Sequence, residues 1–268
     1  MTADDRLALV RVKVERAKQH IRDLDIAVKS FFDTKPYVVG TKRNPQTPQL
    51  TYYMVSVGET PTTLTAIAGD VLQNLRSALD HLAYQLVLVG SGVSGPTRHT
   101  CFPISDDAAI YKVETPRKVR GMLPAAIEAI DAIKPYKGGN DTLWRLHRLN
   151  NVDKHRLLIT TGSAFRALDL GSYMTQMLQR FIPPGSPLGA IEPLPAFYRP
   201  ADRMFPLKAG DELFIGGSDD VPNEKMGFAF DIAFGEPQVV EGEPLLDTLQ
   251  QMADLVDNLI LAFKPFLA

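Results

Sequence analysis

Cysteine is almost missing from this chain, since Cys101 is the only one in 268 residues. A lone cysteine excludes an internal disulfide and any zinc site that needs several cysteine ligands. No apolar run reaches the ~20 residues that a membrane-spanning helix needs, and the first ten residues, MTADDRLALV, are acidic where a secretory signal would be basic. We therefore expect a cytoplasmic protein that does not engage a membrane.

A surplus of charge is missing as well, because the formal net charge is only -2. A nearly neutral chain has no general attraction for nucleic acid, so any polyanion must bind to a local basic patch. The sequence also lacks a GxSxG elbow and the glycine-rich loops that cradle nucleotide phosphates. We therefore expect no serine-nucleophile enzyme and no cofactor.

Helical periodicity is what the sequence does contain. Residues 4–33 carry a heptad seam of apolar residues: Leu7, Val10, Val14, Ala17, Ile21, Leu24, Val28 and Phe31. Such a seam packs either on the protein's own helices or on a second copy of the chain in a homodimer. Further helices are predicted at 61–89, with Thr60 as the capping residue before Pro61, and at 107–113, 124–134, 141–156 and 244–263.

Strand-like segments accompany these helices. KPYVVGTKR and QLTYYMVSV predict a β-hairpin, and further strands are expected at 157–168, 211–216 and 226–234. A proline-rich insertion at about 182–200 is either a flap over a cleft or a surface excursion. Together the elements predict a single α+β domain over residues 1–268, with a helical bundle packed beside a largely antiparallel β-sheet.

The helix at 61–89 has a polar stripe opposite its leucines: Asp70, Asn74, Ser77, His81 and Gln85. Arg76 and Asp80 lie one turn apart at its edge and are expected to form an intrahelical ion pair. The stripe is either a solvated outer face or part of a site.

The helix at 141–156 places Asn150 and Asp153 among its leucines. Buried polar groups need hydrogen-bond partners, so we expect both to bind a neighbouring element, with Arg76 as one candidate partner. The residues predicted to form this structural polar lock are Asp80, Asn150, Asp153, Lys154 and Arg156.

The other side of the same helix is basic and aromatic: Trp144, Arg145, His147, Arg148, Asn151 and His155. This face is either a solvated basic surface or a site for phosphate or carboxylate, with Trp144 available to stack a base. His147 and His155 are separated by about 12 Å along the helix, too far to share a metal ion, and we expect no metal site.

From Arg76 to His81 the sequence has an arginine, a polar residue, three more residues and then a histidine, which resembles the short signature of HEPN-type domains. The resemblance implies metal-independent cleavage of RNA, in which His81 assists attack of the ribose 2'-hydroxyl and Arg76 steadies the phosphate. To these we add Arg148 as a second phosphate ligand and His155 as a second acid or base. Arg148 to His155 repeats the spacing, although apolar Leu149 follows the arginine.

A broader resemblance is carried by three blocks, NLRSALDHLAYQLV, CFPI and LWRLHRLNNVDKHRLL. Their order is similar to that in a family of uncharacterised bacterial proteins, which implies one constellation drawn from both polar helices but no reaction. Two hypotheses follow. The first is an HEPN-like protein that cleaves RNA or binds a nucleotide; the second is a non-catalytic module that binds a small anionic ligand or a protein partner. A metal-dependent enzyme is a third.

Overall fold

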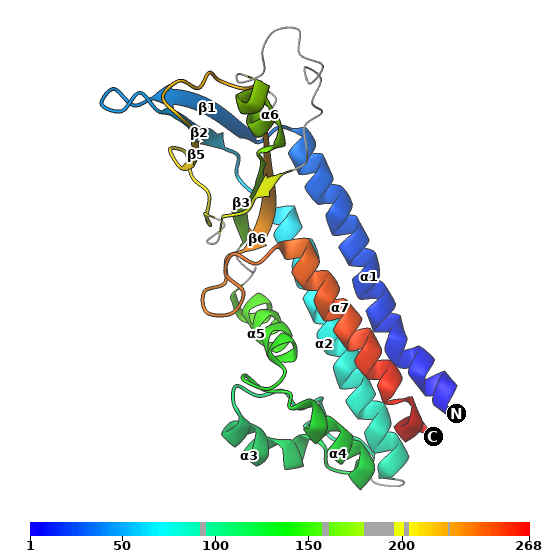
Figure 1. The fold of residues 1–268 in the computed structure, drawn as a ribbon. Coiled ribbons are helices and arrows are strands. Elements are labelled where there is room, and N and C mark those ends of the chain that lie inside the picture. Colours follow the sequence, from blue (N-terminus) through cyan, green and yellow to red (C-terminus); the bar gives the residue numbers. More distant parts are fainter. Residues whose placement is uncertain (92–94, 157–160, 180–195, 201–203, 225) are drawn as a thin grey trace.

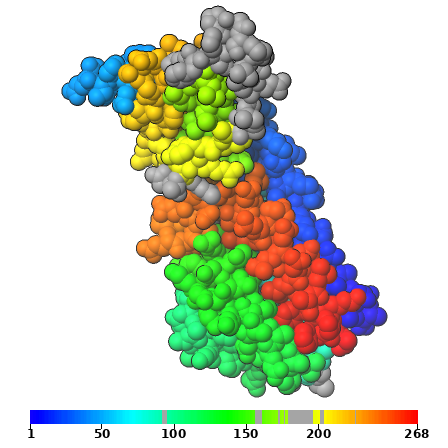
Figure 2. Space-filling view, in the orientation of Figure 1, coloured from blue at the N-terminus to red at the C-terminus, as the bar shows by residue number. Residues whose placement is uncertain are grey.

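The computed structural model describes every residue except 92–94, 157–160, 180–195, 201–203 and 225. Its elements are α1 (Ala3–Asp33), β1 (Tyr37–Arg43), β2 (Leu50–Val57), α2 (Thr62–Gly90), α3 (Ala108–Lys118), α4 (Pro124–Ile133), α5 (Asp141–Arg156), β3 (Thr161–Asp169), α6 (Gly171–Gln179), β4 (Phe197–Tyr198), β5 (Glu212–Ile215), β6 (Gly227–Phe234), α7 (Leu245–Ala262) and the 3-10 helix η1 (Lys264–Leu267). The molecule is elongated, with two small sheets at one end and a helical bundle at the other (Figures 1 and 2). The predicted α+β class is confirmed.

Helix α1 starts at a capping box. Asp5 N–H donates to Thr2 Oγ1 at 3.1 Å, and Thr2 N–H donates to Asp5 Oδ2 at 2.8 Å, so two donors at the helix start are satisfied. All eight residues of the predicted heptad seam are buried, where α1 packs along α2 and α7 (Figure 1). The seam is therefore used within the chain and is not free to form a homodimer.

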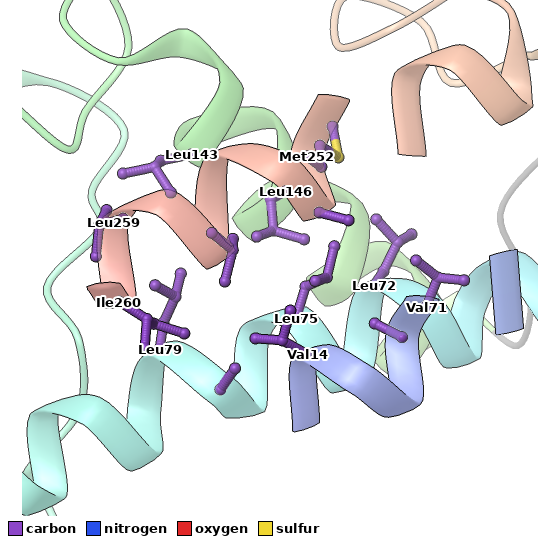
Figure 3. Packing of buried hydrophobic residues seen from close by; sticks show 14 of the residues in the cluster. Val14, Val71, Leu72, Leu75, Leu79, Leu143, Leu146, Met252, Leu259 and Ile260 are labelled. Atoms are coloured by element: carbon purple, nitrogen blue, oxygen red, sulfur yellow. The ribbon is translucent and has the colours of Figure 1, made fainter. Parts of the chain in front are cut away.

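Helix α2 lies at the centre of the bundle. Val71, Leu72, Leu75 and Leu79 have no exposed surface, and Figure 3 shows them packed among side chains of α1, α5 and α7. The helix begins one residue later than predicted, at Thr62. Its N-cap is Pro61, which makes no side-chain capping hydrogen bond, so Thr60 does not serve as the cap.

Helices α3 and α4 form a small unit beside the C-terminal end of α2. Asp107 caps α3 by accepting the N–H groups of Ala109 and Ile110, both at 2.8 Å. The helix continues beyond the predicted end at 113 and contains Pro116, a residue that usually ends a helix. A Lys118–Glu114 ion pair of 2.6 Å supports this last turn.

The two sheets have strand orders β1-β2-β5 and β4-β3-β6, and every pairing is antiparallel. The predicted hairpin is β1 and β2. A second hydrophobic cluster joins the sheets, with Tyr52 and Phe228 rings 5.5 Å apart. Helix α6 was not predicted. Residues 157–160 of the predicted third strand, and most of the proline-rich insertion, lie outside the described residues; β4 falls within that insertion.

Among the described residues, no helix combines the length and the apolar character needed to cross a bilayer.

The turn between α3 and α4 rests on Gly90, the last residue of α2. A Cβ atom at this position would lie only 2.7 Å from the Leu123 backbone nitrogen and 2.9 Å from the Met122 carbonyl carbon. We expect Gly90→Ala to lower the free energy of unfolding by about 1–3 kcal/mol, because backbone atoms must move apart. Urea denaturation measures this change. Ala66→Gly, at an exposed site of α2, is the control and should cost about 1 kcal/mol from helix propensity alone; a fully tolerated Gly90→Ala would contradict the tight contact.

Candidate functional site

Arg76 is a buried structural residue of α2. Its Nη2 donates to the Phe102 carbonyl oxygen at 2.8 Å and lies 2.9 Å from Asp80 Oδ1, and the residue is only 6% exposed. Asp80 Oδ1 also accepts the Phe102 N–H at 3.0 Å. The predicted ion pair of Arg76 and Asp80 is confirmed, and together they clamp both backbone groups of Phe102 onto α2.

His147 lies on α5, close enough to Arg76 for the charge of that residue to affect its pKa. Burial is the largest cause that lowers its pKa, followed by the charges of Arg76 and Lys118, and the pKa falls to about 4. Asn151 Nδ2 lies 3.1 Å from His147 Nε2, a donor and acceptor pair when the imidazole is neutral. His147 therefore stays neutral at pH 7 and packs within the structure.

Asn150 is 1% exposed, as its place among the leucines of α5 predicted. Neither Asn150 nor Asp153 is bonded to Arg76 among the described contacts. A Cβ atom on Gly69 would lie 2.8 Å from the Asp153 carboxyl carbon, so the Asp153 carboxylate rests directly on the α2 backbone. Burial, with the charge of Asp70, raises the Asp153 pKa. The Arg76 partners predicted on α5 are replaced by Asp80 and Phe102.

Trp144 is also buried and is not available to stack a base. It is 7% exposed, its Nε1 donates to Asp106 Oδ1 at 3.0 Å, and Lys137 Nζ lies 4.6 Å from the centre of its ring. Arg148 Nη1 lies 3.7 Å from the other Asp106 carboxylate oxygen. Trp144 and Arg148, which were both predicted to bind a ligand, thus attach the segment before α3 to α5.

The remaining predicted residues of α5 lie nearer the surface. Arg145 and Asn151 are half-buried, whereas Lys154 and His155 are exposed. The side chain of Arg156 lies outside the described residues. This part of α5 offers a small exposed basic surface.

His81 is exposed, but it does not share a site with His155 in this chain. Asp153 marks where the end of α5 meets α2, at Gly69. His81 lies twelve residues further along α2, about 18 Å along the helix axis. Arg76, His81 and His155 therefore occupy separate places on the molecule: one in the core and two on its surface.

A cavity lies between α3 and α4, and none of the site residues predicted from the sequence lines it. Its volume is about 600 Å³ and its lining is mostly apolar. Pro116, Val119 and Ile127 form its floor and walls. The rings of Tyr111 and Tyr136, 5.4 Å apart and tilted by 51°, stand at one end.

Polar groups border this cavity at both ends. The Tyr111 hydroxyl donates to Asp131 Oδ1 at 2.7 Å and joins α3 to α4. Burial and the neighbouring Asp131 raise the Tyr111 pKa, so the phenol remains protonated. Lys112 and Arg120 line the cavity, are exposed, and form no ion pair with any described residue. An apolar cavity bordered by unpaired cations suits a small organic anion.

Lys112 and Arg120 were not among the predicted site residues. Lys112 lies in α3, and Arg120 lies two residues beyond the end of that helix at Lys118. They line one cavity only because α3 packs against α4, and the helix predicted from the sequence stopped at residue 113.

Comparison of the chain with protein-family models, with curated proteins and with solved structures gave no match. Its function is therefore argued from the chemistry of its own residues.

The clamp on Phe102 predicts a specific loss of stability. Asp80→Ala leaves the Arg76 guanidinium without its carboxylate partner and the Phe102 N–H without its acceptor, and we expect the free energy of unfolding to fall by about 2–4 kcal/mol. Asp80→Asn keeps an acceptor oxygen and should lose less. Chemical denaturation at pH 7 compares them, with Asp70→Ala as the exposed acidic control. Equal stability of Asp80→Ala and wild type would show that the clamp is unimportant.

The buried His147 predicts an acid-dependent loss of stability. The unfolded chain binds a proton at His147 near pH 6.5, but the folded chain does so only near pH 4. The free energy of unfolding therefore falls as the pH is lowered from about 6.5 to 4, by on the order of 3 kcal/mol from this residue. In His147→Gln this contribution is absent, so the stability profile should be flatter across that range. His81→Gln, at an exposed histidine, should follow the wild-type curve, and identical curves for all three proteins would refute the assignment.

Proposed function

We propose that this protein is a non-catalytic module that binds a small anionic ligand, and that the cavity between α3 and α4 is its binding site. The observation that carries the proposal is an apolar cavity of about 600 Å³ whose border includes Lys112 and Arg120. Neither cation has an ion-pair partner among the described residues, so both are available to a ligand.

The surroundings of the cavity support an anion. Residues 98–156 contain eleven lysines and arginines and seven aspartates and glutamates, although the whole chain is slightly acidic. A local excess of positive charge attracts anions and increases their rate of association. A concave apolar lining is also better suited to a small molecule than to the flat surface of a protein partner.

The polar residues of α2 and α5 fit the structural part of the same hypothesis. Arg76, Asp80 and Trp144 are engaged with Phe102 and Asp106, inside the chain. RNA cleavage by the HEPN-like residues would need Arg76 to reach a phosphate. Since Arg76 is 6% exposed and already bonded, the geometry favours a binding module over a ribonuclease.

Binding can be tested with small carboxylates and phosphates, each paired with the neutral alcohol of the same carbon skeleton. We expect the anions, and not the alcohols, to raise the melting temperature and to give a binding isotherm by calorimetry. Lys112→Gln/Arg120→Gln should weaken binding by about tenfold for each cation that contacts the ligand, which corresponds to about 1.4 kcal/mol. The matched control is Arg98→Gln/Arg117→Gln, which removes two exposed charges outside the cavity lining.

Two results would reject this proposal. One is the absence of binding by any anion in the set. The other is cleavage of labelled RNA that persists in EDTA and is lost in His81→Ala, which would favour the ribonuclease.

A further inference from the structure

The two ends of the α3–α4 cavity differ in charge. At one end, Arg120 stands alone as a cation without a described partner. At the other end, Lys112 directly follows Tyr111, whose hydroxyl is bonded to Asp131 Oδ1. A cation and a carboxylate therefore share that end, and their charges offset each other. The anionic group of a ligand is attracted most strongly to the Arg120 end, where a guanidinium also offers two parallel donors to a carboxylate.

At its end of the cavity, the Asp131 carboxylate provides a hydrogen-bond acceptor for the ligand. Only Oδ1 of Asp131 has a described partner, the Tyr111 hydroxyl. Because that phenol stays protonated, it keeps donating to Oδ1. The second carboxylate oxygen, Oδ2, is left for a donor on the ligand.

The charges at this end decide which donor fits. A second carboxylate is repelled by Asp131 and attracted by Lys112, so it gains little there and still loses its hydration, and a dianion is disfavoured. An ammonium group is attracted by Asp131 and repelled by Lys112, with the same small gain and loss of hydration, so a zwitterion is disfavoured as well. A neutral hydroxyl meets neither penalty, and it can donate to Asp131 Oδ2 in a charge-assisted hydrogen bond.

Between the two ends the lining is apolar and partly aromatic. The Tyr111 and Tyr136 rings lie 5.4 Å apart near the Asp131 end, and Pro116 and Val119 continue the surface toward Arg120. Lys112 lies in α3, whereas Arg120 lies two residues beyond the end of that helix at Lys118. The helical part of this interval is about 9 Å long, so an elongated ligand of about that length fits between the two ends.

From these constraints we propose that the ligand is an aromatic hydroxy-carboxylate, with its carboxylate on Arg120, its ring against Pro116 and the tyrosines, and its hydroxyl on Asp131. This inference rests on the proposed function and specifies the ligand class of the same cavity. Because the proposed ligand contacts both ends of the cavity, each end is tested separately.

Calorimetry with three related probes tests the proposal on the whole protein. The probes are 3-(4-hydroxyphenyl)propanoate, 3-phenylpropanoate, which lacks the hydroxyl, and 3-(4-hydroxyphenyl)propan-1-ol, which lacks the carboxylate. We expect the hydroxy acid to bind about tenfold or more tightly than either of the others, since each loses one hydrogen bond to a charged group.

Two substitutions assign the ends. Asp131→Asn should reduce the preference for the hydroxy acid over 3-phenylpropanoate to about threefold or less, because the hydrogen bond is no longer charge-assisted. Glu128→Gln, at an exposed acid on the same helix and outside the cavity lining, is its matched control and should keep the wild-type preference. Arg120→Gln should abolish the preference for the acid over the alcohol, with Arg117→Gln as its control. Circular dichroism and melting temperature check that each variant is folded.

The outcomes separate this inference from the function on which it rests. If the hydroxy acid and 3-phenylpropanoate bind equally, or if none of the probes binds while other anions do, the inference is wrong and the anion-binding function stands. If the alcohol binds as tightly as the hydroxy acid and Arg120→Gln changes nothing, both fail. If no anion binds at all, the function fails first.

Discussion

A buried guanidinium organises the helical end of this protein. Arg76 lies inside the bundle, and a charge in that position is strongly destabilising unless it is paired and hydrogen-bonded. The available partners are Asp80, one turn along α2, and the carbonyl of Phe102. Because Asp80 also accepts the Phe102 N–H, the chain after α2 is bound at this point by both backbone groups. The direction in which it continues toward α3 follows from that attachment.

The next residues extend the attachment to α5 and α3. Asp106 accepts the Trp144 indole N–H and pairs with Arg148, so it fastens the segment to α5. Asp107 caps the first turn of α3. The backbone N–H of Ser105 donates to Pro135 at 3.1 Å, next to the cavity residue Tyr136. One short segment thus determines where α3 begins relative to α5, and the cavity lies between α3 and the helix that follows it.

The polar residues that first attract interest are therefore mostly structural. A histidine, a tryptophan and an arginine in one helical segment have the chemistry of a binding site, but here their groups are used between elements of the same chain. His147 is neutral because burial and nearby cations oppose a further charge. Lys112 and Arg120 have no ion-pair partner among the described residues, and they lie on α3 and just beyond its end, in a less conspicuous part of the sequence. Their importance comes from the space beside them and from the lack of an intrachain partner.

The sequence by itself determined the elements with strong periodicity and the α+β class. The heptad seam of α1, the leucines of α2 and the alternation in β6 each depend on the spacing of apolar residues along one element, which is a local property. The ion pair of Arg76 and Asp80 is local for the same reason. The start of α5 at Asp141 agrees with the predicted start at residue 141.

Only the tertiary structure decided which polar groups are occupied. Helical projection gives the direction in which Trp144 or Arg76 points, but the carboxylate of Asp106 and the carbonyl of Phe102 reach them from a separate segment. The strand orders likewise depend on pairing between distant residues, such as β2 with β5. The cavity exists because α3 and α4 are joined by a turn on Gly90 and by the Tyr111–Asp131 hydrogen bond, leaving space between them. An unpaired cation and a cavity between two helices are properties of several elements at once, and no single stretch of sequence contains them.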